Sequence, residues 1–203
     1  MRALLCRSLG SIDALAVAEI ESPRLGSGQI RIQVHASGVN FPDILMVEGK
    51  YQVKPELPFI PGLEVAGIVL ECAQGVDRVR PGDRVLAFAR RGGGHAQEVV
   101  VPNAIVTPIP AAMDFTVAAA FPVAYGTAHF ALMHRGRLLA GEVLLVLGAS
   151  GVWAWRPSKL ANSLAHASLR LLAHRISLPL PDSTAPTKSS TTLPKTCVIA
   201  CVT

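Results

Sequence analysis

The stretch GEVLLVLGASG, residues 141–151, decides how the rest of the chain is interpreted. A turn at Gly-Glu precedes residues 143–147, a continuous apolar run typical of a parallel strand that is covered on both faces. The glycine-bearing segment at 148–151 allows a tight turn and lets a phosphate group approach bare backbone closely. This order predicts a buried strand followed by the start of a phosphate-binding loop.

The chain changes character directly after this stretch. A dinucleotide-binding fold would continue with more glycine and a helix, whereas residues 152–157 are VWAWRP. All 17 glycines lie at or before Gly151, and residues 178–196 are rich in proline, serine and threonine. We therefore expect residues 152–203 to be an unrelated, largely disordered tail, as in a truncated or alternatively spliced form.

The formal net charge of +5 comes from that last segment alone. Residues 1–151 carry equal numbers of acidic and basic side chains, which argues against a nucleic-acid-binding domain there. The basic residues of the tail are spread out, so a solvated segment is favoured over a membrane or nucleic-acid contact. They include Arg156, Lys159, Arg170 and Arg175. No apolar run is long enough to cross a membrane, and the four scattered cysteines form neither a paired zinc pattern nor a dense disulfide framework.

Short apolar or alternating segments separated by glycine and proline turns fill the first half of the chain. Strands are predicted at residues 2–6, 15–20, 29–36, 65–71, 84–89, 96–101 and 105–109. In residues 29–36 the alternation places Ile30, Ile32, Val34 and Ala36 on one face. Such closely spaced strands predict a compact, barrel-like β domain.

Helices are expected at four places. A short one spans residues 44–48, where Asp43 is a candidate cap. Two more, residues 115–121 after Asp114 and residues 124–134, precede the strand at 143–147. Residues 159–176 carry leucines in loose helical register.

Six motifs occur in one order along the chain. They are SGVNFPD at 37–43, GKY at 49–51, LPFIPGLEVAGIV at 57–69, RPGDRV at 80–85, AAAFPVAYGTA at 118–128 and AGEVLLVLGASG at 140–151. In this order they resemble the zinc-free quinone oxidoreductases of the medium-chain dehydrogenase/reductase superfamily. The resemblance covers residues 1–151.

This resemblance implies an α+β architecture. A GroES-like β-barrel domain at residues 1–112 would be followed by a helical linker and the first strand of an incomplete Rossmann domain at 113–151, then by the tail at 152–203. In the family, the nicotinamide cofactor lies in the cleft between the two domains. Members often dimerise through the far edge of the Rossmann sheet, so without that edge the family dimer is not expected.

The resemblance also suggests roles for individual residues. Asn40 would donate hydrogen bonds near the nicotinamide or the substrate oxygen, and Tyr51 would line the pocket. Thr127 would bind the carboxamide of the cofactor. The residues that would shape or contact the pyrophosphate turn are Gly148, Ser150 and Gly151. From the residues alone, Asn40 could equally bind loop backbone, Tyr51 could be loop packing, and Thr127 could bond within its own helix.

No metal is predicted. The zinc-dependent relatives place a cysteine and a histidine where this chain has Ser37 or Asn40 and Leu63. We expect His35 to be a solvent-facing strand residue and His95 a loop residue. Glu64 is expected to brace the cleft loop rather than to perform acid–base chemistry.

The implied activity is NAD(P)H-dependent, zinc-independent transfer of hydride to a quinone or an α,β-unsaturated carbonyl compound, with NADPH as the expected cofactor. Because the cofactor domain stops early, this chain is expected to be inactive alone. The alternative is a truncated, non-enzymatic isoform that acts at most as a binding module. The expected location is the cytoplasm, or the mitochondrion if a targeting segment is missing.

Overall fold

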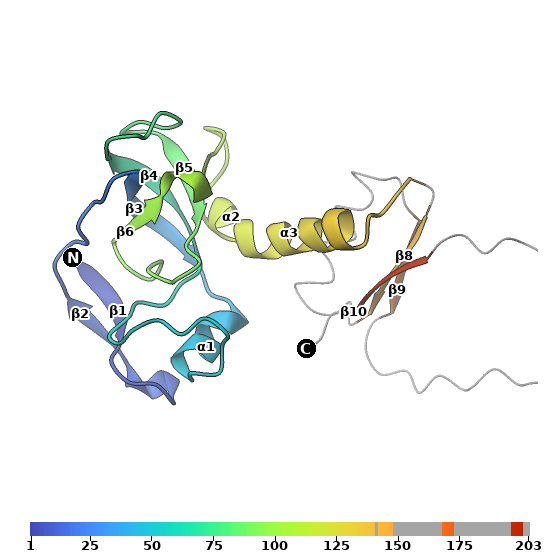
Figure 1. Ribbon diagram of the computed structural model, residues 1–203, viewed down its shortest axis with the longest axis horizontal. Helices are drawn as coiled ribbons and strands as arrows, with labels where there is room; N and C mark the ends of the chain where they lie inside the picture. Colours follow the sequence, from blue (N-terminus) through green and yellow to red (C-terminus); the bar gives the residue numbers. More distant parts are fainter. Residues whose placement is uncertain (141, 148–167, 173–195, 201–203) are drawn as a thin grey trace, which may run out of the picture. The chain divides into compact units, whose positions relative to one another are not determined.

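The computed structural model describes residues 1–140, 142–147, 168–172 and 196–200. The chain divides into two compact units, Met1–Val123 and Ala124–Thr203 (Figure 1). The domain boundaries expected at residues 112 and 151 stay predictions. The proline-rich segment at 178–195 and the basic residues Arg156, Lys159 and Arg175 lie outside the described residues.

A five-stranded antiparallel sheet forms the centre of the first unit, in the order β6-β3-β4-β5-β7 (Figure 1). Its strands are β3 (Gln29–Gly38), β4 (Glu64–Cys72), β5 (Arg84–Phe88), β6 (Glu98–Pro102) and β7 (Val106–Pro108). A separate antiparallel pair joins β1 (Arg2–Cys6) to β2 (Leu15–Glu19). All seven predicted strands are present and the α+β class is confirmed. The sheets are not closed into a barrel, because β6 and β7 remain edges in the described part of the chain.

One face of the large sheet builds the hydrophobic core. Its buried members include Ile30, Ile32, Val65, Val69, Val85, Val99, Val101 and Val106. Val34 packs against this cluster as predicted, but Ala36 packs with Ala66 and Ala118 in a second cluster. The prediction that Ala36 shares the face of Ile30 is wrong because the register of β3 against β4 shifts between Val34 and Ala36.

The second cluster is covered by α2 (Phe115–Ala119), which packs against β3, β4 and β5. Asp114 caps the helix, and its side chain accepts a hydrogen bond from the Thr116 amide at 2.7 Å. The guanidinium of Arg84 lies 3.8 Å from the ring centroid of Phe115. These contacts fix α2 on the sheet.

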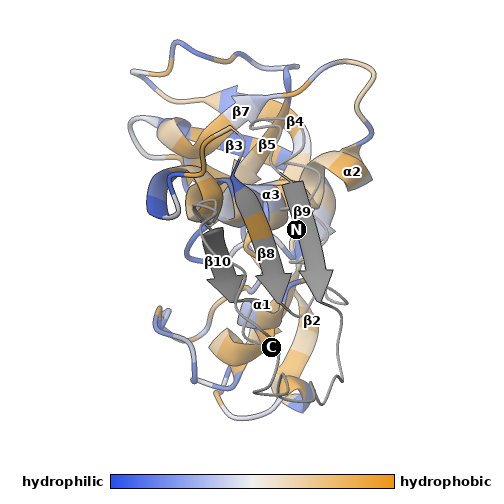
Figure 2. Cartoon of the chain, turned by 90° about the vertical axis from the view of Figure 1, so that its right-hand side faces the viewer, coloured by the Kyte–Doolittle hydropathy of each residue, from blue (hydrophilic) through white to orange (hydrophobic). Residues whose placement is uncertain are grey.

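The helix α1 (Phe41–Val47) begins earlier than predicted. Its N-cap is Asn40, and Pro42 lies in the first turn, where a missing N–H removes no helical hydrogen bond. Asp43 is therefore not the cap; it is the third helical residue and accepts a hydrogen bond from the Asn40 amide at 2.7 Å. Figure 2 colours α1 and β2 mainly as hydrophobic, and Val17 and Phe41 on these elements are exposed.

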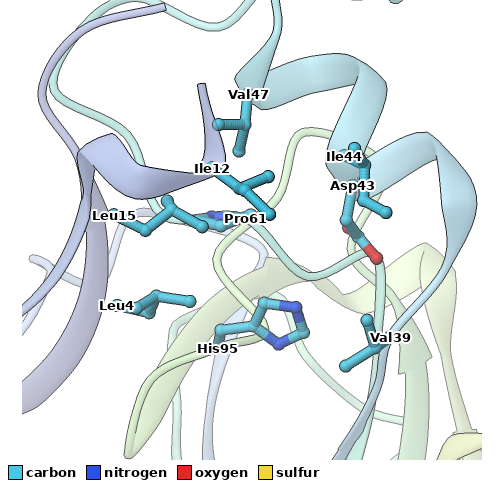
Figure 3. Close-up of a pocket in the computed structure, with 9 residues that line it drawn as sticks. All are labelled: Leu4, Ile12, Leu15, Val39, Asp43, Ile44, Val47, Pro61 and His95. Atoms are coloured by element: carbon cyan, nitrogen blue, oxygen red, sulfur yellow. The ribbon is translucent and has the colours of Figure 1, made fainter. Parts of the chain in front are cut away.

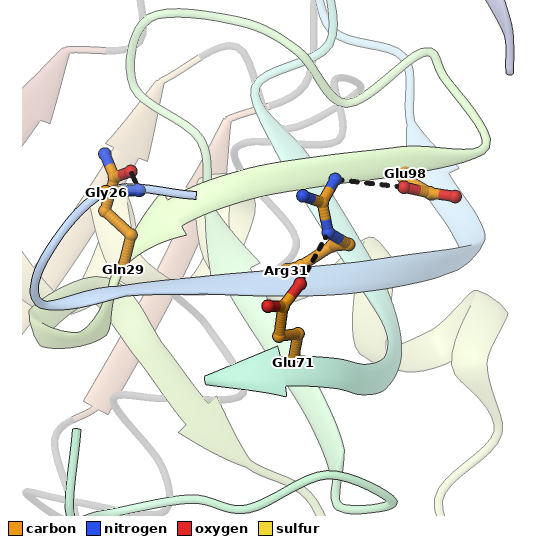
Figure 4. A network of polar contacts seen from close by, with 5 residues as sticks. All are labelled: Gly26, Gln29, Arg31, Glu71 and Glu98. Carbon is orange, nitrogen blue, oxygen red and sulfur yellow. Dashed lines mark hydrogen bonds and ion pairs between the residues drawn. The ribbon is translucent and has the colours of Figure 1, made fainter. Parts of the chain in front are cut away.

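A charged network lies across three neighbouring strands of the sheet (Figure 4). Arg31 of β3 donates to Glu71 of β4 at 3.3 Å and to Glu98 of β6 at 3.2 Å. The arginine is mostly covered while Glu71 is well exposed to solvent. These pairs join the strands on the face opposite the core.

The second unit contains a three-stranded parallel sheet in the order β10-β8-β9. The strand β8 (Val143–Leu147) was predicted, and Leu144 within it is fully buried. Its partners are β9 (Ser168–Leu172) and β10 (Thr196–Ala200), which both lie in the segment that was expected to be a largely disordered tail. The helix expected over 159–176 is wrong for residues 168–172; its remaining residues lie outside the described part.

Two helical segments precede this sheet. The helix α3 (Pro122–His129) is followed by a π-helical turn, η3 (Phe130–Arg135), where one helix over 124–134 was predicted. Single-turn 3₁₀ helices complete the described chain at η1 (Ile12–Ala14) and η2 (Asn103–Ile105). None of the described helices is long and apolar enough to cross a membrane.

Candidate functional site

Glu64 is a buried carboxylate at the first position of β4, with only 3% of its surface exposed. Its Oε1 accepts a hydrogen bond from Asn40 Nδ2 at 2.8 Å, and its Oε2 accepts one from the Val123 amide at 2.7 Å. A side chain at Gly38 would collide with the Glu64 carboxylate, so glycine provides the space that Glu64 fills. The prediction that Glu64 braces this region is confirmed.

Asn40 is held in place through both its backbone and its side chain. Its backbone amide binds Asp43 Oδ2, and its side-chain amide donates one N–H to Glu64. An asparagine amide carries two N–H groups, and within the described part of the chain only one of them is used, so the second can bind the oxygen of a ligand. The buried carboxylate therefore orients a half-buried hydrogen-bond donor at the start of α1.

Asp43 is the second buried carboxylate of this region, with 4% of its surface exposed. Besides the Asn40 amide, it accepts a hydrogen bond from the backbone of Gly62, at 3.0 Å from Oδ1. Each of its oxygens thus has a backbone partner. Asp43 ties the first turn of α1 to the loop that leads into β4.

His95 and Ser37 form a polar pair that sequence reasoning did not find. The distance between Ser37 Oγ and His95 Nδ1 is 2.9 Å, and Ser37 Oγ also lies 3.0 Å from the carbonyl oxygen of Glu64. Burial lowers the pKa of His95, and the negative charge of Asp43 partly opposes this change. His95 does lie in a loop, as predicted. No motif could have indicated its contact, since the two residues are far apart in the sequence.

The other predicted site residues have different surroundings. Tyr51 lies half-buried just after α1, and its backbone amide donates to the carbonyl of Leu45 at 3.1 Å. Thr127 lies exposed on α3. The pyrophosphate-loop residues Gly148, Ser150 and Gly151 lie outside the described residues.

Two further expectations concern His35 and the absence of a metal site. His35 is exposed on β3, as predicted, with its ring centroid 4.6 Å from that of Phe115. In the described part of the chain, no three residues of metal-binding type are grouped closely enough to hold an ion.

Comparison with known proteins shows what this chain is similar to. Residues 26–111 match the family described as the alcohol dehydrogenase GroES-like domain. A quinone oxidoreductase-like protein 2 homolog from Nematostella vectensis is 43% identical over 150 residues, which are 74% of this chain and 41% of that protein. The similarity to quinone oxidoreductase-like protein 2, which the motif order also predicts, is thereby confirmed.

Two further relatives carry the name quinone oxidoreductase. The protein from Rattus norvegicus is 39% identical over 152 residues, covering 74% of this chain and 46% of that protein. The solved structure from Thermus thermophilus, also determined in complex with NADPH, is 34% identical with a TM-score of 0.71 over 85% of this chain and 52% of that one. The chain spans less than half the length of the two curated relatives.

Proposed function

The chain belongs to the quinone oxidoreductases of the medium-chain dehydrogenase/reductase superfamily, and on that premise we propose that it serves the NADPH-dependent reduction of a quinone or an α,β-unsaturated carbonyl compound. The observation that carries the proposal is the Asn40 amide, oriented by the buried carboxylate of Glu64. A fixed donor of this kind suits an acceptor whose oxygen gains negative charge during reduction.

The described residues that could meet a nicotinamide cofactor have suitable chemistry. Asn40 keeps one N–H after its bond to Glu64, and Thr127 presents a hydroxyl on an exposed helical position. When bound, NADPH supplies the hydride. We propose that Thr127 holds the carboxamide, and that Gly148, Ser150 and Gly151 meet the pyrophosphate through backbone N–H groups.

The residues on the acceptor side act by placement. Asn40 would donate to the acceptor oxygen and lower the free energy of the charge that develops on it. Tyr51 would line the acceptor site and limit the access of water. Glu64 remains a positioning residue, because its two oxygens already accept hydrogen bonds from Asn40 and Val123.

The test uses the 203-residue chain with NADPH and a series of quinones and enones. Cofactor fluorescence measures binding, and the loss of nicotinamide absorbance in stopped flow measures turnover. With any accepted substrate, Asn40→Ala should lower kcat/KM by about a hundredfold, as loss of one preorganised donor does. Gln33→Ala, on an exposed position of β3, serves as the control.

The possible results distinguish the reductase from the non-enzymatic binding module. Turnover that depends on Asn40 supports the reductase. Saturable NADPH binding without turnover favours the binding module instead. If neither binding nor turnover is found with any acceptor, the reductase proposal is wrong for this chain, and the expectation that it is inactive alone is met.

A further inference from the structure

We propose that the pocket between β1, β2 and α1 binds a small, neutral phenol whose hydroxyl donates a hydrogen bond to Nε2 of His95 (Figure 3). The pocket has a volume of about 220 Å³. Its apolar walls are formed by Leu4, Ile12, Leu15, Val39, Ile44 and Val47. His95 and Asp43 are its polar members, and Figure 3 shows both among the apolar side chains.

The contacts of Ser37 assign the tautomer of His95. A serine hydroxyl has a single proton, and Ser37 Oγ lies near both the Glu64 carbonyl oxygen and His95 Nδ1. The carbonyl can only accept, so the arrangement that satisfies both contacts has Ser37 donating to Glu64 and Nδ1–H donating to Ser37. In neutral His95, Nε2 then carries the lone pair. Because burial lowers the pKa of His95, the ring stays neutral near pH 7.

The backbone of His95 is held by hydrogen bonds through both its amide and its carbonyl. The His95 amide donates to the Pro61 carbonyl at 2.9 Å, and the His95 carbonyl accepts from the Leu4 amide at 2.8 Å. Gly62 has a φ of +100°, and a side chain there would come within 2.8 Å of Nδ1 and 2.6 Å of the His95 amide nitrogen. Glycine at this position therefore lets the ring lie against the loop. Together with the contact between Nδ1 and Ser37, these bonds orient the ring at the wall of the pocket.

The remaining features of the pocket select the class of ligand. A cavity of about 150 Å³ with apolar walls accepts benzene, so this pocket has room for one substituted ring. The buried carboxylate of Asp43 repels anions, which excludes benzoates in favour of neutral molecules. A phenol combines an apolar ring with one strong donor, which matches one imidazole acceptor on an apolar wall.

This site makes no use of the residues proposed for reduction. Neither Asn40 nor Tyr51 lines the pocket, and no cofactor is needed for the phenol to bind. Its test is therefore independent of the oxidoreductase activity.

The experiment titrates the ¹⁵N-labelled, 203-residue chain with p-cresol and follows the imidazole nitrogens of His95 by NMR. The matched control ligand is 4-methylanisole, which keeps the ring and the oxygen but has no O–H. We expect p-cresol to bind in about the millimolar range, as a ligand of about eight heavy atoms can, and to shift the resonance of an unprotonated Nε2. A protonated Nε2 in the free protein, equal binding of 4-methylanisole, or no saturable binding of p-cresol would each overturn the proposal.

Two variants locate the site. His95→Asn keeps a donor near the Nδ1 position but removes Nε2, and should weaken p-cresol binding about tenfold. Val39→Trp places a bulky group at an exposed lining position, so it should block binding without affecting the core, whereas Val117→Trp on the exposed face of α2 should not. Wild-type affinity in both His95→Asn and Val39→Trp would contradict the assignment.

Discussion

The two larger sheets of the described chain differ in how far the local sequence specifies the pairing of their strands. In the antiparallel sheet of the first unit, the strands β5 and β6 and the first half of β3 alternate between buried and less buried side chains, whereas β4 is buried on both faces at its start. The strand β8 is apolar at every position, and its partners lie far along the chain, at 168–172 and 196–200. An alternating pattern predicts which face of a strand packs on the core. A uniformly apolar pattern predicts only that both faces are covered.

The largest effect on the free energy of unfolding is expected from a substitution in the core of the antiparallel sheet. Ile32→Ala removes a fully buried side chain from the centre of the core cluster, and should lower the free energy of unfolding of the first unit by about 2–5 kcal/mol. Urea unfolding followed by circular dichroism measures the change.

The control for this substitution lies one residue along the same strand. Gln33→Ala alters an exposed side chain on the opposite face and should change the free energy of unfolding by less than about 0.5 kcal/mol. Equal effects of the two substitutions would contradict the assignment of the faces.

The next prediction tests the parallel sheet. Leu145→Pro removes a backbone donor from β8, which is paired on both sides, so a ladder hydrogen bond to β9 or β10 is lost whichever way that N–H points. Amide protection in residues 169–172 and 197–200 should fall about tenfold or more in hydrogen exchange. The edge strands of the first unit already contain proline, at Pro102 and Pro108.

Leu145→Ile is the matched control, because it keeps the N–H and the apolar character. If hydrogen exchange in β9 and β10 is the same in both variants, the three-stranded arrangement is wrong.

The same contrast explains which parts of the fold the sequence predicts. The seven strands of the first unit were predictable because short apolar or alternating runs bounded by turn residues are local signals. The partners of β8 were not, because residues 168–172 carry a pattern of leucines that fits a helix as well as a strand. The face of Ala36 was missed since a register shift in β3 has no local signal.

The candidate site also contains some features that the sequence predicts and others that it does not. Glu64 was predicted as a brace of the cleft loop with the help of the family resemblance. The cap of α1 was missed by three residues because Asn40 and Asp43 are both good capping types, and only the helical position of Pro42 distinguishes them. The pairing of Ser37 with His95 joins the end of β3 to a loop far along the chain and could be found only in the structure.

A smaller effect is expected from pH, through His95. Burial lowers its pKa in the folded chain, so the unfolded chain takes up the proton first as the pH falls below about 6.5. The stability that the neutral ring contributes is therefore present above that pH and is lost as the pH falls toward the folded pKa. The free energy of unfolding, measured from about pH 7.5 to about pH 5, should decline more steeply in the wild type than in His95→Asn. Parallel curves would contradict a buried, neutral imidazole.

The smallest effect is expected in the charged network on the outer face of the first sheet. Glu71→Gln removes the more exposed of the two carboxylates that contact Arg31, so it should cost no more than about 1 kcal/mol, and less in high salt. Glu98→Gln should cost more, because Glu98 is better shielded from solvent at nearly the same distance from the guanidinium. Thermal unfolding of both variants at low and high ionic strength gives the order. If Glu71→Gln is the more destabilising, the network contributes through strand pairing at β4 rather than through charge, and the register of β3 against β4 depends on that side chain.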